Sequence, residues 1–170
     1  ARSSADAMER LIRLNIVALT RLSHAALTGF RARGAGTLIN IGSIMAFAPS
    51  KGGAVYSGSK AYVLNFTRSL QLEHAGSAVR IQVVLPGPIR TEFFSSQGLS
   101  DAIFPDSAYI SADQLVDAAL AGLDAGEAIT SPTLGDTATW AAIEAAREAY
   151  LASTLSGRVA SRYAAGQPSE

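Results

Sequence analysis

The sequence predicts an α/β protein in which a parallel sheet of about three strands is flanked by helices. Two short apolar runs, residues 37–43 and 79–88, are bounded by glycine or proline, as strands covered on both faces are. A segment with helical periodicity lies between them, and a strand, a helix and a strand in this order form a crossover unit with parallel strands. With 170 residues, 48% of them apolar, the chain is long enough for one compact domain.

Four segments have the apolar spacing or the caps of helices, at residues 5–30, 56–74, 112–125 and 136–153. In the first of them apolar residues recur at steps of three and four, which predicts a long amphipathic helix. Ser111 is the expected N-cap of the third helix, and Asp136 or Thr137 that of the fourth. A weaker third strand is expected at 127–134, between these two helices.

Two further segments lack a regular period. Residues 91–110 combine aromatic residues, serines and one proline, which predicts either a functional flap or a poorly ordered loop. Residues 154–170 have the composition of a frayed tail. We therefore expect a single α/β domain over residues 1–153, followed by a tail over 154–170.

Composition excludes several classes of function. Fourteen basic residues balance fourteen acidic ones, so neither nucleic acid nor an anionic membrane is an expected partner. The chain has no cysteine, which excludes disulfides, thiolate metal ligands and thiol catalysis, and we expect no metal site. No apolar run approaches the roughly 20 residues of a membrane helix. These features together predict a cytoplasmic protein.

Polar side chains gather at the expected carboxyl edge of the sheet, where ligands bind in open parallel sheets. Ser43 closes the first strand, "PGPIRT" ends the second, and Tyr56 and Lys60 lie in the first turns of the helix between them. Residues four apart share a helix face, so the Lys60 ammonium is expected to lower the pKa of Tyr56 below its usual value of about 10. Tyr56 could then exchange a proton with an alcohol or carbonyl oxygen that also accepts a hydrogen bond from Ser43.

The order of these features resembles that of the short-chain dehydrogenase/reductase family, over about residues 5–135. The shared pattern is an asparagine in a helix (Asn15), "INIGS" at the end of a strand, "YSGSK" thirteen residues further on, and "PGPIRT" (86–91). The resemblance implies a partial Rossmann-like, doubly wound parallel sheet. It also implies an oxidoreductase that uses NAD or NADP and acts on a carbonyl or a secondary alcohol.

The resemblance assigns a role to each matching residue. Tyr56 would be the general acid/base, and Lys60 would lower its pKa and hold the nicotinamide ribose, so that both also contact the cofactor. Ser43 would orient the substrate carbonyl, and Asn15 would hold a water molecule in the proton relay behind Lys60. The residues implied to line the nicotinamide pocket are Pro86, Gly87, Ile89 and Thr91, and the loop over 92–110 would cover the substrate.

The sequence also departs from the family pattern. The G-x-x-x-G-x-G turn that receives the cofactor pyrophosphate and the N-N-A-G element do not occur in it. The chain therefore resembles a truncated domain, the catalytic half of a reductase. It could be a sequence whose first part has been lost, a natural half-length relative with changed function, or a chain that associates with a complementary piece. The truncated chain could also use no cofactor.

Two alternative functions remain open on the sequence alone. Ser43, Tyr56 and Lys60 could form a cluster in which Ser43 is the nucleophile of a cofactor-independent esterase, which would act on an ester substrate. Alternatively, the chain could be an inactive piece that persists as a homo-oligomer. The surfaces expected to join the copies are the helices at 5–30 and 56–75.

Overall fold

The computed structural model of the chain describes residues 4–92 and 104–163. Ala1–Thr133 form one compact unit and Leu134–Glu170 a second. In chain order the elements of the first unit are α1 (Ala5–Ile12), a π-helical segment η1 (Arg13–Ala18), α2 (Leu19–Arg33), β1 (Gly36–Ile41), a short 3-10 helix η2 (Ile44–Ala46), α3 (Ala54–Glu73), β2 (Val79–Val84), β3 (Ile89–Arg90), η4 (Asp106–Ala108), β4 (Ile110–Ser111), α5 (Ala112–Asp124) and β5 (Ile129–Thr130).

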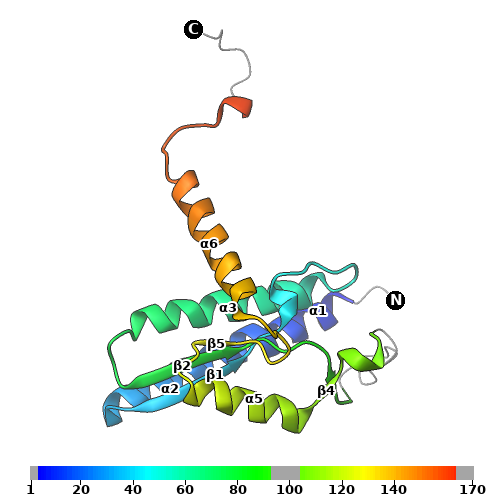
Figure 1. Cartoon of the computed structure of the whole chain (residues 1–170), viewed down its shortest axis with the longest axis vertical. Helices are drawn as coiled ribbons and strands as arrows, with labels where there is room; N and C mark the ends of the chain where they lie inside the picture. The colour runs from blue at the N-terminus through cyan, green and yellow to red at the C-terminus, as the bar shows by residue number, and fades with distance from the viewer. Residues whose placement is uncertain (1–3, 93–103, 164–170) are drawn as a thin grey trace. The chain divides into compact units, whose positions relative to one another are not determined.

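Three strands form a parallel sheet in the order β1, β2, β5, which confirms the predicted fold class. Gly36 is in register with Val79 and Ile41 with Val84, so β1 and β2 pair along their whole length. In Figure 1, α3 leaves the end of β1 and returns the chain to the start of β2, which is the expected crossover. β3 and β4 form a separate parallel pair of two residues each.

The helices cover both faces of this sheet. On one face, Leu27 of α2 and Leu70 of α3 form a buried cluster with Val79 and Ile81 of β2. The neighbouring residue Gln82 points the other way, as alternation along a strand requires, and its Nε2 donates to the carbonyl oxygen of Ala119 in α5 at 3.0 Å. The sheet is therefore held by an apolar core on one face and by a buried polar contact on the other.

The predicted helices and strands are present, with changes at their boundaries. The helix expected at 5–30 consists of α1, η1 and α2, so a π-helical turn interrupts the α-helix at its middle. The strand expected at 79–88 ends at Val84, and Pro86, which has no backbone N–H to donate, follows closely. The strand expected at 127–134 is only two residues long, Ile129–Thr130.

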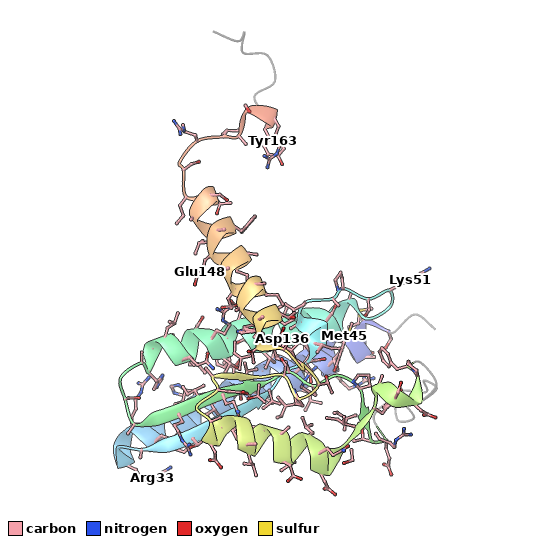
Figure 2. The ribbon with its side chains drawn as sticks, viewed as in Figure 1. Arg33, Met45, Lys51, Asp136, Glu148 and Tyr163 are labelled. Atoms are coloured by element: carbon pink, nitrogen blue, oxygen red, sulfur yellow. The ribbon has the colours of Figure 1, made fainter. Side chains whose placement is uncertain are left out.

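The second unit consists of α6 (Thr137–Thr154) and a short 3-10 helix η5 (Ser161–Tyr163). Asp136, labelled in Figure 2, caps α6 by accepting a hydrogen bond from the backbone N–H of Ala138 at 2.8 Å, as the sequence predicts. The single domain expected over 1–153 and the tail over 154–170 stay predictions. Within the described residues no helix is both long and apolar enough to cross a membrane.

Candidate active site

Ser43 lies just beyond the carboxyl end of β1, in extended backbone. Its side chain caps η2 by accepting a hydrogen bond from the backbone N–H of Met45 at 3.1 Å, and only 6% of the residue is exposed. Figure 2 shows Met45 at the end of the sheet opposite to Arg33, which follows from the direction in which β1 runs. Ser43 is therefore held by backbone at the sheet edge where the sequence places the chemistry.

Gly42 explains how Ser43 comes so close to the second strand. The N–H of Gly42 donates to the carbonyl oxygen of Val84 at 2.8 Å. A Cβ atom at Gly42 would lie 2.7 Å from Leu85 Cδ2 and 3.2 Å from that carbonyl oxygen, so a side chain does not fit. The next link is a hydrogen bond from the N–H of Ile44 to the carbonyl oxygen of Pro86 at 3.1 Å, which ties the Ser43 segment to "PGPIRT".

Tyr56 reaches Ser43 from the first turn of α3, and the two side chains are hydrogen-bonded. Burial raises the pKa of Tyr56 above its ordinary value, and the hydrogen bond with Ser43 acts in the opposite direction but less strongly. The phenol is therefore protonated at neutral pH in this chain. A protonated, hydrogen-bonded phenol at a sheet edge can act as a proton donor to a carbonyl oxygen.

Lys60 lies one turn further along α3, with its Nζ 5.7 Å from the centroid of the Tyr56 ring. The ammonium donates to the carbonyl oxygen of Ile41, the last residue of β1, at 3.0 Å. Burial lowers the pKa of Lys60. The expected lowering of the Tyr56 pKa is not found, because Lys60 binds a backbone carbonyl and burial dominates at Tyr56.

Asn15 lies inside the π-helical segment, and its side-chain amide is hydrogen-bonded to Ser59. Its Nδ2 donates to Ser59 Oγ at 2.9 Å, and Ser59 Oγ donates in turn to the carbonyl oxygen of Tyr56 at 2.7 Å. Ser59 is the one neighbour in this network that the sequence did not single out. Its position directly before Lys60 was visible in "YSGSK", but nothing local indicated a partner 44 residues away.

The residues expected to line a nicotinamide pocket follow β2. Gly87 lies near the Ser43 segment, since a Cβ atom there would be 3.8 Å from Ile44 Cδ1. Ile89 pairs with Ile110 in the β3–β4 ladder, and Thr91 comes directly after β3. Part of the loop expected to cover the substrate, residues 93–103, lies outside the described residues.

The donors of this site fit one end of a dinucleotide. Lys60 has three N–H bonds, and within the described residues one of them donates to Ile41, which leaves two donors for the hydroxyl groups of a ribose. The hydroxyls of Ser43 and Tyr56 can donate to the oxygen of a substrate that lies beside this ribose. Among the described residues no group of three or more His, Cys, Asp or Glu side chains could hold a metal ion.

Comparison with known proteins gives a consistent set of relatives. The family of the short chain dehydrogenases matches residues 1–101. A short-chain dehydrogenase from Sphingobium yanoikuyae, solved with NADPH, is 39% identical with a TM-score of 0.88, and the match covers 95% of this chain and 62% of that one. The bulky-bulky ketone specific alcohol dehydrogenase from Comamonas testosteroni is 33% identical with a TM-score of 0.82, over 96% of this chain and 61% of that one.

A curated relative gives the same assignment at lower coverage. Sulfoacetaldehyde reductase 2 of Chromohalobacter salexigens is 34% identical over 113 residues, which are 63% of this chain and 45% of the relative. The matched region thus spans less than half the length of this curated relative.

Proposed function

Since the chain belongs to the short-chain dehydrogenase/reductase family, we propose that it carries the catalytic residues of an NAD(P)-dependent oxidoreductase acting on a carbonyl or a secondary alcohol. The observation that carries the proposal is the hydrogen bond between Tyr56 and Ser43 at the carboxyl edge of the parallel sheet, with Lys60 fixed to the last residue of β1. Three side chains from two separate segments thus face one place beside the strand ends.

In the direction of reduction, Tyr56 gives its proton to the carbonyl oxygen of the substrate while Ser43 donates a hydrogen bond to the same oxygen. The raised pKa of Tyr56 suits this direction, because the phenol holds its proton at neutral pH until a developing alkoxide accepts it. The nicotinamide cofactor, when bound, supplies the hydride. Lys60 would hold the ribose, Asn15 would support the proton relay, and Pro86, Gly87, Ile89 and Thr91 would line the nicotinamide pocket.

The relatives support the coarse substrate class. The matched proteins include a sulfoacetaldehyde reductase and a ketone-specific alcohol dehydrogenase, which act on carbonyl or alcohol groups by name. The neighbour from Sphingobium yanoikuyae was solved with NADPH, which supports NADP as one of the two cofactors proposed. The family match gives no support to the esterase alternative. A cytoplasmic location belongs to the same proposal, supported by the absence of cysteine.

We also propose that copies of the chain associate through α1–α2 and α3. Large apolar side chains lie exposed on the first of these helical segments, with exposed fractions of 69% for Leu14 and 71% for Leu22. Burial of such side chains in a second copy would contribute roughly 1.5–3 kcal/mol each. Their spacing places them on the helix surface away from the core residue Leu27.

A binding titration tests the proposed function with the chain as it is. NADPH and reduced nicotinamide mononucleotide, which lacks the adenosine half, are titrated by fluorescence against wild type and Lys60→Met. We expect both ligands to bind saturably to wild type and more weakly to the variant. Equal binding to the two proteins would contradict the role of Lys60. Turnover of a nitrophenyl ester that is lost in Ser43→Ala, without dinucleotide binding, would replace the reductase proposal with the esterase.

A further inference from the structure

A short polar chain joins the first helical segment to the turn of α3 that carries Tyr56. Asn15 Nδ2 donates to Ser59 Oγ at 2.9 Å, and Ser59 Oγ donates to the Tyr56 carbonyl oxygen at 2.7 Å. Ser59 is 2% exposed, so water does not compete for its hydroxyl group. The hydroxyl donates one hydrogen bond within α3 and accepts another from η1, so it connects the two elements.

The π-helical segment explains how Asn15 reaches this position. Five residues after Asn15, Thr20 Oγ1 is hydrogen-bonded to the hydroxyl of Tyr62 in α3 at 2.7 Å. In a regular α-helix, residues five apart are rotated by about 140° from each other, so the two could not both face α3. A π turn has the i→i+5 repeat that brings them to one side. Because of η1 (Arg13–Ala18), both Asn15 and Thr20 contact α3, whereas a regular α-helix would let only one of them do so.

Other serines of α3 show what an ordinary serine in a helix does here. Ser57 Oγ donates to the carbonyl oxygen of Gly53 at 3.0 Å, and Ser69 Oγ to that of Asn65 at 3.1 Å. Both bonds stay within the helix, as is common for serine. Ser59 makes the same kind of bond and in addition accepts one from a segment 44 residues away. Its structural setting is therefore different from that of Ser57, although the residue type and the helix are the same.

We propose that Ser59 is a positioning residue for Tyr56: by joining Asn15 to the Tyr56 carbonyl group, it fixes the first turns of α3 so that the Tyr56 hydroxyl stays at Ser43. The catalytic consequence rests on the proposed function. The positioning itself is a property of this chain and can be measured without cofactor or substrate.

The first part of the test asks whether the hydrogen bond between Asn15 and Ser59 forms in solution. Free energies of unfolding are measured for Asn15→Ala, Ser59→Ala and the double variant. If the side chains share one bond, the double variant loses less stability than the sum of the single losses. The matched control combines Asn15→Ala with Ser57→Ala, for which the losses should add. Additive losses in the Asn15 and Ser59 cycle would overturn the proposal.

The second part asks whether loss of the Asn15–Ser59 hydrogen bond changes the environment of Tyr56. The ionisation of Tyr56 is followed by the absorbance of the phenolate, as the difference between each variant and the same variant carrying Tyr56→Phe. We expect a displaced midpoint in Ser59→Ala and in Asn15→Ala, and an unchanged one in Ser57→Ala. Tyr62→Phe, which breaks the bond to Thr20 but keeps the ring beside Phe66, should also leave the midpoint unchanged.

An unmoved Tyr56 midpoint in Ser59→Ala would overturn the proposal even if the stability cycle shows coupling, because the bond would then be structural only. Neither measurement uses the cofactor or a substrate, so a failure of the reductase proposal would leave both readouts intact. If reduction is observed, Ser59→Ala should lower kcat more than it changes KM, since the substrate contacts remain.

Discussion

Tyr56 and Lys60 lie four residues apart on α3, and burial moves both away from their charged forms. Burial raises the pKa of Tyr56 and lowers the pKa of Lys60, because each loses water around its ion. The hydrogen bond with Ser43 is the one favourable influence found on the phenolate. At neutral pH, Tyr56 is therefore a protonated phenol, and it lies beside a lysine side chain that is hydrogen-bonded to the backbone.

The raised pKa of Tyr56 predicts how stability depends on pH. The folded chain holds this proton more tightly than the unfolded chain, in which tyrosine ionises at about pH 10. The contribution to stability is thus present below about pH 10 and is lost as the pH rises further. Urea unfolding between about pH 9 and pH 11 should show a steeper loss for wild type than for Tyr56→Phe. Tyr150→Phe, at an exposed site, should follow wild type; parallel curves for all three would contradict the prediction.

Gly42 gives a second prediction for a single residue. Gly42→Ala would place Cβ 2.7 Å from Leu85 Cδ2, so we expect a loss of about 1–3 kcal/mol in the free energy of unfolding. Gly58→Ala is the matched control, because nothing lies within 4 Å of its Cβ position and alanine favours a helix by up to about 1 kcal/mol. Denaturant unfolding measures both changes. If Gly42→Ala were as stable as Gly58→Ala, the end of β1 would have room for a side chain beside Leu85, which would contradict the prediction.

At the scale of elements, the sequence predicts what depends on neighbours along the chain. The crossover from β1 through α3 to β2 follows from apolar period and from Pro86, and the helix beginning after Ser111 follows from local capping. The π turn of η1 was not predictable, because apolar residues continue through it at helical spacing. The contact of Asn15 with Ser59 was hidden for the same reason: its acceptor lies on another helix, and only the packed fold brings it near.

The cap of α5 is a prediction at this scale. Ser111 Oγ accepts from the N–H of Gln114 at 3.1 Å, and the Gln114 side chain accepts from the N–H of Ser111 at 2.8 Å, which completes a capping box. Ser111→Ala should cost about 1 kcal/mol in the free energy of unfolding. Ser69→Ala, at an exposed serine that bonds only within its helix, should change it by less than about 0.5 kcal/mol. Equal losses in thermal unfolding would contradict the role of the cap.

For the whole molecule, the candidate site and the exposed apolar side chains of α1–α2 lie in different places. The candidate site gathers at the carboxyl edge of the sheet, where Ser43 and the segment after β2 meet. α2 packs on the same face of the sheet as α3, opposite to α5, and the exposed apolar side chains of α1–α2 point away from that core. The sequence predicted both regions from periodicity and order. The substrate was not predictable, because residues 91–110 have no period from which a contact could be inferred.

The oligomer proposal predicts a change of mass. Leu14→Lys with Leu22→Lys should shift the chain toward monomer in sedimentation at several concentrations, because two exposed apolar side chains gain charge. Val116→Lys, on the exposed surface of α5, is the matched control and should sediment as wild type does. A monomeric wild type, or equal masses for both variants, would contradict association through α1–α2.

The most direct measurement is the reduction of a ketone, followed by the loss of reduced nicotinamide absorbance, in wild type, Tyr56→Phe and Tyr62→Phe. We expect Tyr56→Phe to lower kcat by about 100-fold or more, because it removes the proton donor. Tyr62→Phe, which removes a hydroxyl from the same helix without touching Ser43, should keep kcat near that of wild type. Equal kcat values for wild type and Tyr56→Phe would show that the proton comes from another group and would contradict the proposed role of Tyr56.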